Sequence, residues 1–317
     1  MCYFLSICIP TYNGGENLKY NVNKLIKMQP EFGFEVCVSD NASDDDTQEF
    51  MKDIIGKCDF VKYHRNGENL GIAYNFDYAL NMGNGEYRWL LGDDDEIVQE
   101  NLGKVISSLK EYKPDICVVN GGPLENLMLS KYACDRFFYD KNEILSKLGE
   151  HMTWMSSLVL SKKMLNNIKI KEITFNAFPH AVEVFKFLDK KCNLFWISNC
   201  CVIVQRNYQN RYTKHYLEYF IRDWIGITKL IGDYNEKAKK EFCKSVEQRL
   251  FTYRAILSFK ARDLINNEII SKSIEVDTDK YFSKKKILCI KIVNLIPNVI
   301  MELLYKFYKN YVKLLIK

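Results

Sequence analysis

Residues 84–96 read NGEYRWLLGDDDE, and this stretch indicates both the fold and the chemistry of the chain. An Asn-Gly turn leads into the short apolar strand 87–91, which runs directly into three consecutive aspartates. Adjacent carboxylates repel one another, so a fold rarely keeps Asp93, Asp94 and Asp95 together for stability alone. They become favourable when a divalent cation, and through it a phosphate, takes up the negative charge. The stretch therefore predicts a phosphate-handling metal site at the end of a strand.

Upstream of this stretch, apolar strands alternate with helices. The hydrophobic patterns predict strands at 3–9, 34–38 and 60–64 and helices at 16–28, 43–55 and 73–82. This alternation is typical of an open, mainly parallel sheet with right-handed crossovers, in which ligands bind beyond the carboxyl ends of the strands. Thr11-Tyr12-Asn13 and Asp40-Asn41 lie at such ends, as the three aspartates do. We therefore expect three polar clusters to converge on one edge of the sheet.

The second half of the chain has a mixed pattern. Short strands are predicted at 116–119, 158–160, 195–197 and 202–204, and the chain from about residue 213 is mostly helical. No internal repeat or low-complexity linker divides it.

Composition and charge exclude several classes of protein. A net charge of +5 is too small for typical nucleic-acid binding. None of the 11 cysteines has the Cys-x-x-Cys spacing of zinc or redox sites, so we expect reduced, buried thiols. The N-terminus lacks the basic lead and cleavage site of a signal peptide, and no apolar run is long enough to span a membrane. The expected location is therefore the cytoplasm.

Four motifs carry a resemblance to a known family. Residues 5–13, LSICIPTYN, resemble the opening strand of family 2 glycosyltransferases, and the family's later motifs follow in order at 38–47 (VSDNASDDDT), 69–71 (NLG) and 85–95. The resemblance covers residues 5–97 and fades further on. It implies an α/β fold of GT-A type, with an open, mainly parallel nucleotide-binding sheet, helices on both faces and here a helical C-terminal extension. It also implies a nucleotide-diphosphate-sugar donor, a divalent metal and inversion at the anomeric carbon.

The resemblance carries donor-site roles over to matching positions. In the family, the residues at Thr11 and Asn13 line the nucleotide pocket, and Asp40 accepts a hydrogen bond from the base edge. The rest of the expected donor site consists of Pro10, Tyr12, Asn41, Asn69, Gly71, Asn75, Asp93 and Asp94. Turn or helix-capping roles are the alternative for Thr11 and Asp40.

The metal ligands are expected among the three aspartates. We take Asp95 as the most direct ligand together with Asp93, while Asp93 and Asp94 share ribose and water-mediated contacts. Many members carry an aspartate where this chain has Gly92, which leaves the register open. An all-oxygen site suits Mn²⁺ or Mg²⁺. A solvated acidic turn is the alternative.

An inverting displacement also needs a base that takes the proton of the acceptor hydroxyl. Family members supply a carboxylate at the start of a helix about 80–100 residues downstream of the aspartates. Here the matching stretch is 178–187, with His180 at the carboxylate position and Glu183 one turn later. Imidazole can serve as a base near neutral pH. We favour His180 over Glu183, and a structural role at the helix start remains the alternative.

Two softer candidates accompany this set. Trp154 precedes a strand and is either the floor of a sugar pocket or a core residue. The segments 205–207 and 211–212 carry Arg206 and Arg211, which either approach the diphosphate or form a solvated basic loop.

The C-terminal segment is basic as well as apolar. Residues 271–317 contain ten lysines and four acidic residues, interleaved with Leu, Ile, Val, Tyr and Phe. This composition is typical of a helix lying on an anionic membrane, with packing on the protein itself or a partner subunit as the alternative.

Together these features predict a metal-assisted, inverting glycosyltransferase on the inner face of the cell membrane. Residues 1–100 would bind the nucleotide sugar, UDP being the favoured nucleotide, residues 101–212 would form the acceptor side, and 213–317 the extension. The acceptor would be a hydroxyl of a glycan or lipid-linked glycan in bacterial surface-polysaccharide synthesis; homo-oligomer formation is left open. The rival functions are a nucleotide-sugar-binding protein without turnover and a sugar nucleotidyltransferase. The latter normally has a basic residue in a glycine-rich loop after the first strand, where this chain has none before Lys19.

Overall fold

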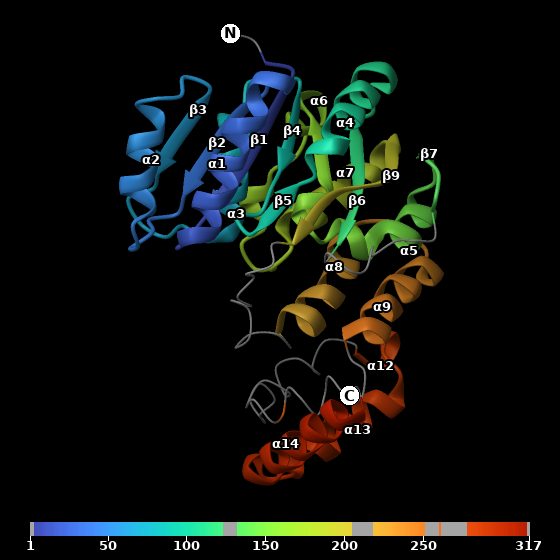
Figure 1. The fold of residues 1–317 in the computed structure, drawn as a ribbon. Coiled ribbons are helices and arrows are strands. Elements are labelled where there is room, and N and C mark those ends of the chain that lie inside the picture. The colour runs from blue at the N-terminus through green and yellow to red at the C-terminus, as the bar shows by residue number, and fades with distance from the viewer. Residues whose placement is uncertain (1–2, 123–131, 205–217, 251–259, 261–277, 316–317) are drawn as a thin grey trace. The chain divides into compact units, whose positions relative to one another are not determined.

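The computed structural model describes residues 3–122, 132–204, 218–250, 260 and 278–315. The chain divides into two compact units, one of residues 1–144 and 151–209 and the other of residues 145–150 and 210–317. The first unit contains a sheet flanked by helices, and the second is helical where it is described (Figure 1). The predicted α/β class and the helical C-terminal extension are thus confirmed.

The first part of the sheet follows the predicted alternation of strands and helices. Its elements are β1 (Leu5–Thr11), α1 (Gly15–Phe32), β2 (Glu35–Asp40), α2 (Thr47–Ile55), β3 (Val61–Arg65), α3 (Ile72–Met82) and β4 (Tyr87–Leu90). Figure 1 shows α1 and α3 on opposite faces of the sheet, as expected when the chain reverses direction after β3.

The second part adds antiparallel strands and more helices. Its main elements are β5 (Asp95–Ile97), α4 (Gln99–Tyr112), β6 (Ile116–Gly122), β7 (Arg136–Phe138), α5 (Lys141–Met152), β8 (Leu158–Ser161), α7 (Pro179–Lys190) and β9 (Leu194–Val204). Three short helices, η1 (Met155–Ser157), α6 (Lys162–Leu165) and η2 (Ile170–Glu172), lie between them.

The two strands predicted at 195–197 and 202–204 are wrong as separate elements, because they form the single strand β9. Its pairing with β6 shifts register twice, around Asn120. Asn120 donates its side-chain amide to the Ser198 carbonyl oxygen (2.9 Å), which holds the irregular stretch in place. Residues 198–200, which lie between the two predicted strands in the sequence, occupy this irregularity.

The strand order is β3-β2-β1-β4-β8-β6-β9-β5, with β7 also paired to β9. The strands β3, β2, β1 and β4 are parallel, and so are β6 and β9, whereas β8, β5 and β7 run antiparallel to their neighbours. The sheet is therefore mostly parallel, and the carboxyl ends of β2, β1 and β4 meet at one edge.

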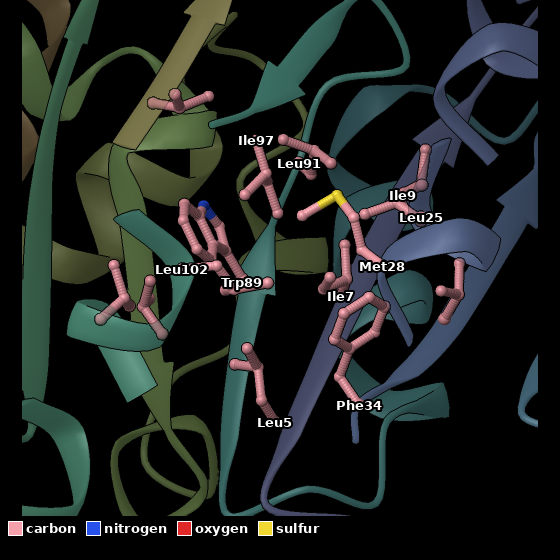
Figure 2. Packing of buried hydrophobic residues seen from close by; sticks show 14 of the residues in the cluster. Leu5, Ile7, Ile9, Leu25, Met28, Phe34, Trp89, Leu91, Ile97 and Leu102 are labelled. Carbon is pink, nitrogen blue, oxygen red and sulfur yellow. The ribbon is translucent and has the colours of Figure 1, made fainter. Parts of the chain in front are cut away.

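The core lies on both sides of β1. All seven residues of β1 are buried, as the continuous apolar run predicted for a strand covered on both faces. Figure 2 shows Ile7 and Ile9 of this strand near Leu25 and Met28 of α1, with Trp89 of the neighbouring β4 close by. Central strands packed in this way form a rigid base for the loops at their carboxyl ends.

The Asn84-Gly85 turn is fixed at the opposite edge of the sheet. Glu35 Oε1 accepts hydrogen bonds from Ser6 Oγ (2.6 Å) and Asn84 N (2.5 Å), and Lys62 Nζ lies 2.7 Å from Glu35 Oε2. A Cβ atom at Gly85 would lie 2.7 Å from Ser6 Oγ, so only glycine fits. Burial alone would raise the pKa of Glu35, but the bonds from Lys62, Ser6 and Asn84 hold it below its usual value.

The second unit consists of helices in the described residues. Besides residues 145–150 of α5, they are a π-helical turn at Glu218–Asp223, α8 (Trp224–Leu230), α9 (Glu236–Leu250), α12 (Thr278–Tyr281), α13 (Lys284–Leu295) and α14 (Asn298–Leu315). Trp224 of α8 stacks on Phe242 of α9 with ring centroids 5.0 Å apart. Among the described helices, none has both the length and the apolar character needed to cross a bilayer.

Candidate active site

The polar clusters predicted at three strand ends come together in the structure. Thr11 ends β1, Asp40 ends β2, and Asp93 follows β4, which pairs with β1 on the side away from β2. Thr11 Oγ1 donates a hydrogen bond to Asp93 Oδ2 at 2.6 Å. A Cβ atom at Gly14 would lie 2.4 Å from Thr11 Oγ1 and 2.9 Å from Asp93 Oδ2, so the glycine is required for this contact. The motif at the end of β1 and the aspartate turn are thus directly joined.

The carboxylate of Asp40 is fully buried and held on both oxygens. Oδ1 accepts from the backbone N–H (2.8 Å) and hydroxyl (2.5 Å) of Ser43, and Oδ2 accepts from the Tyr63 hydroxyl at 2.7 Å. Arg65 Nε lies 3.6 Å from Oδ2. Burial, then the hydrogen bond to Asp40, raises the pKa of Tyr63 well above its ordinary value. The side chain of Asp40 is therefore held in one orientation at this edge of the sheet by three hydrogen bonds.

The loop after β1 is locked to the loop after β2. Asn13, with a positive φ of 54°, donates its backbone N–H to Ser43 Oγ (2.9 Å) and accepts at Oδ1 from Asp44 N (2.9 Å). Pro10 is buried in β1, and the side chain of Tyr12 is exposed beside this junction.

The motif at residues 69–71 is hydrogen-bonded to the same edge of the sheet. Asn41 Nδ2 donates to Asn69 Oδ1 at 2.7 Å, and Gly71 N donates to the same Asn69 oxygen at 3.0 Å. Gly71 has a φ of 86°, which favours glycine. Asn75 bridges the motifs, since its Nδ2 donates to the Thr11 carbonyl oxygen (3.1 Å) and its Oδ1 accepts from Ser39 Oγ (2.6 Å). One network thus connects all three loops.

The three aspartates differ in environment. Asp93 and Asp95 are buried, while Asp94 between them is partly exposed. Asp95 Oδ2 accepts hydrogen bonds from Trp154 Nε1 (2.7 Å) and from Ser156 Oγ. Burial, followed by the charge of Asp94, raises the pKa of Asp95 to about 8. The carboxylate of Asp95 is thus directed toward the 154–156 segment.

Two side chains that the sequence analysis left without a role hold the aspartate turn. Ser156 Oγ also accepts from Gly92 N at 2.8 Å, and Asn21 Nδ2 of α1 donates to the carbonyl oxygen of Asp95 at 2.6 Å. Asn21 lies on the buried face of α1, among Leu18, Val22 and Leu25. A polar residue on an otherwise apolar helix face is the signal that would have identified it.

The oxygen ligands at this turn suit Mn²⁺ or Mg²⁺. Among the described residues, no three His, Cys, Asp or Glu side chains form a ready metal site. Carboxylates are nevertheless the ligands that these ions prefer, and three of them, Asp93, Asp94 and Asp95, follow one another at the turn. The donor set therefore fits a metal whose remaining ligands come from a bound diphosphate and water.

The two candidate bases lie on α7 and are both enclosed. His180 is buried; its Nε2 lies 3.0 Å from the Thr153 carbonyl oxygen, and its Nδ1 forms no hydrogen bond. Burial lowers the pKa of His180 to about 4. Glu183 accepts from Lys169 N and Lys186 Nζ, both at 2.9 Å. Thr153 precedes the Trp154 that binds Asp95, so α7 is adjacent to the aspartate turn. Within the described chain, neither candidate base hydrogen-bonds to the strand-end network.

Two further candidates have different outcomes. Trp154 is partly buried against the core and donates its Nε1–H to Asp95, which agrees with the core role, while the floor of a sugar pocket stays a prediction. Residues 205–207 and 211–212 lie outside the described residues.

Comparison with known proteins identifies the family. The sequence profile described as Glycosyl transferase family 2 matches residues 6–167, about half of the chain. The chain belongs to this family, which confirms the resemblance of its motifs.

Individual relatives agree with this assignment. The abequosyltransferase RfbV of Salmonella typhimurium is 28% identical over 254 residues, covering 74% of this chain and 76% of RfbV. The structure of S. aureus TarS residues 1–349, also solved with UDP and with UDP-GlcNAc, superposes with a TM-score of 0.60 at 16% identity and covers 92% of this chain and 90% of that one. A mannosyltransferase from Pyrobaculum calidifontis, in complex with GDP-Man and Mn²⁺, gives a TM-score of 0.54 at 13% identity, covering 93% and 88%. The predicted GT-A-type fold is confirmed by these structural matches.

Proposed function

We propose that this glycosyltransferase transfers a sugar from a nucleotide-diphosphate sugar to a hydroxyl group with inversion at the anomeric carbon. The observation that carries the proposal is the hydrogen bond from Thr11 to Asp93, which joins the nucleotide motif to the aspartate turn. In the reaction, the acceptor oxygen forms a bond to the anomeric carbon while the bond to the diphosphate breaks. The hydroxyl proton passes to a base, and the nucleoside diphosphate leaves.

The donor site would be the rim formed by Thr11, Asn13, Asp40, Asn41 and Asn69, together with Pro10, Tyr12, Gly71 and Asn75. Its preorganised hydrogen bonds support this role, because groups already held in place lose little entropy on binding. UDP is the favoured nucleotide, which is consistent with the UDP and UDP-GlcNAc complexes of TarS, although the mannosyltransferase complex contains GDP-Man.

Asp93 and Asp94 would hold the divalent metal. The sequence favoured Asp95, but its Oδ2 atom accepts from Trp154 and Ser156 and its pKa is raised to about 8. Asp94 is the most exposed of the three carboxylates, so we propose it as the second ligand in place of Asp95. When bound, the cation would stabilise the negative charge that develops on the departing diphosphate.

His180 remains the proposed base, with Glu183 as the alternative. Its free Nδ1 atom can accept a proton, whereas Glu183 already pairs with Lys186. A pKa of about 4 makes His180 a weak base in the chain alone, and a nearby donor diphosphate would raise that value.

The burial of His180 and the pairing of Glu183 favour one alternative function, that of a nucleotide-sugar-binding protein without turnover. It predicts donor binding with no transfer to any acceptor, so detection of product from a donor and a glycan acceptor would eliminate it.

The wider context is proposed as well. Residues 1–100 would bind the donor and residues 101–212 the acceptor. Residues 213–317 would form a helical extension that associates with the inner face of the membrane. The name of RfbV, an abequosyltransferase, supports surface-polysaccharide synthesis on a glycan or lipid-linked acceptor. Homo-oligomer formation would be measured by light scattering.

The donor site is tested by thermal shift with UDP-, GDP- and dTDP-sugars, each with and without Mn²⁺. We expect metal-dependent stabilisation by one donor, strongly reduced in Asp94→Asn and less so in Asp95→Asn. Equal losses in the two variants would reject the choice of Asp94. The absence of a shift with every nucleotide would reject the donor site itself.

A further inference from the structure

The helix α13 is apolar on two faces. One face is buried within the second unit and consists of Ile287, Ile290 and Val293. The other carries Leu288, Ile292 and Leu295, whose spacing of four and three residues places them on one side of the helix. All three are exposed, Leu295 to 82%. Packing inside the protein therefore explains only one of the two apolar faces.

The helix α14, which follows α13 after residues 296 and 297, exposes a second set of apolar side chains. Of its first ten residues, Met301 is buried, whereas five large apolar residues are exposed: Val299, Ile300, Leu303, Leu304 and Phe307. Phe307 is 75% exposed and Val299 70%. We call the three exposed residues of α13 and the five of α14 the apolar face. A soluble monomer rarely exposes so many large apolar side chains on two consecutive helices, because each leaves nonpolar area in contact with water.

Lysines border the apolar face. On a helical projection with about 100° per residue, Lys284, Lys285 and Lys291 lie within about 70° of the centre of the exposed side of α13. Lys284, Lys285 and Lys291 are exposed, and so is Lys306 on α14. Glu302 is the only acidic residue within the described part of α13 and α14. This combination of apolar residues with flanking cations matches a bilayer surface, in which acyl chains lie beneath anionic headgroups.

We propose that the apolar face inserts into the headgroup region of a membrane containing anionic lipids, with the flanking lysines on the lipid phosphates. The inference deepens the proposed membrane location and rests on it. Charge decides between lipid and a second copy of the chain as the occupant. Two copies would bring the same lysines together and repel, whereas anionic lipids attract them.

The test is flotation of the full-length chain with vesicles. Vesicles of phosphatidylcholine with phosphatidylglycerol should carry the protein upward, and vesicles of phosphatidylcholine alone should carry much less. Phe307→Ser and Leu304→Ser should each lower partitioning by about tenfold if the side chain is fully inserted. Lys284→Gln and Lys285→Gln should each lower it by about fivefold, and only with the anionic vesicles.

Phe175→Ser is the matched control, because Phe175 is also a highly exposed phenylalanine but lies in the first unit. It should partition like the unaltered chain. Equal losses in Phe175→Ser and Phe307→Ser would overturn the proposal, and so would a wild-type chain that stays unbound with both vesicles. If the unbound chain is a dimer that Phe307→Ser dissociates, a second copy covers the face. Donor binding by thermal shift in solution is independent of lipid, so a failed donor site and a failed membrane surface give different results.

Discussion

The burial of His180 has a measurable consequence for the stability of the fold. In the unfolded chain this imidazole titrates near its ordinary pKa of 6.5, whereas in the folded chain burial lowers the pKa to about 4. Between these values the unfolded state holds more protons than the folded state, so the free energy of unfolding falls as the pH falls. The contribution is fully present above pH 6.5 and is lost by about pH 4.

The size of this effect follows from the difference in pKa. A difference of about 2.5 units, at about 1.36 kcal/mol per unit, gives about 3 kcal/mol. Other groups titrate in the same range, so the informative quantity is the difference between the wild-type chain and His180→Gln. The glutamine amide can still donate toward the Thr153 carbonyl oxygen but takes up no proton. We expect the variant to show a smaller loss of stability, by about 3 kcal/mol, over this pH range.

Urea unfolding at closely spaced pH values provides the measurement. His64→Gln is the matched control, because His64 is partly exposed and stacks on Tyr78 at 4.2 Å. It should follow the wild-type profile. If His180→Gln also follows the wild-type profile, the imidazole is not held neutral in the folded chain, and the burial argument is refuted.

Three other substitutions test the contacts around the site. Thr11→Val replaces the hydroxyl that donates to Asp93 by a methyl group and should lower the free energy of unfolding, measured in urea, by about 1.5–3 kcal/mol. Thr11→Ser should keep the hydrogen bond and most of the stability. Similar losses in the two variants would show that this hydrogen bond contributes little. Ser156→Ala leaves the buried Gly92 N–H without its acceptor and should lower the free energy of unfolding by about 1–3 kcal/mol. It should also weaken Mn²⁺-dependent donor binding in calorimetry. Unchanged binding would show that the aspartate turn does not need this hydrogen bond. Glu35→Gln should lower the free energy of unfolding by about 2–3 kcal/mol at neutral pH. Because the pKa of Glu35 is lowered in the folded chain, the difference from wild type should vanish in acid. A difference that does not depend on pH would exclude the charge of Glu35 as its cause.

The sequence predicted those parts of the fold and site that depend on local pattern. The buried strand β1 and the helix-strand alternation up to β4 have clear periodicities, and parallel topology then places Thr11, Asp40 and Asp93 at one edge. The single strand β9 was missed because its polar middle resembles a loop, while its continuity depends on pairing with β6 about 80 residues away.

The contacts that distinguish the three aspartates are equally nonlocal. Asp95 and Ser156 are separated by 61 residues, and neither the spacing nor the composition indicates that they meet. Asn21 presents the same difficulty, since its amide reaches Asp95 from α1 across 74 residues. Local patterns therefore locate the cluster, and only tertiary contacts assign the individual carboxylates.

Gly92 connects the departure from the family pattern with the environment of Asp95. A Cβ atom at this position would lie 2.7 Å from Asp95 Oδ2 and 3.0 Å from Asp94 Oδ1, so a larger residue there would require these two carboxylates to shift. Without a Cβ atom at this position, Asp95 has room to accept hydrogen bonds from Trp154 and Ser156, and Ser156 in turn accepts one from the Gly92 N–H. The glycine thus leaves room for the inward-facing carboxylate. This geometry supports the proposal that Asp93, bonded to Thr11, and the more exposed Asp94 hold the metal in preference to Asp95.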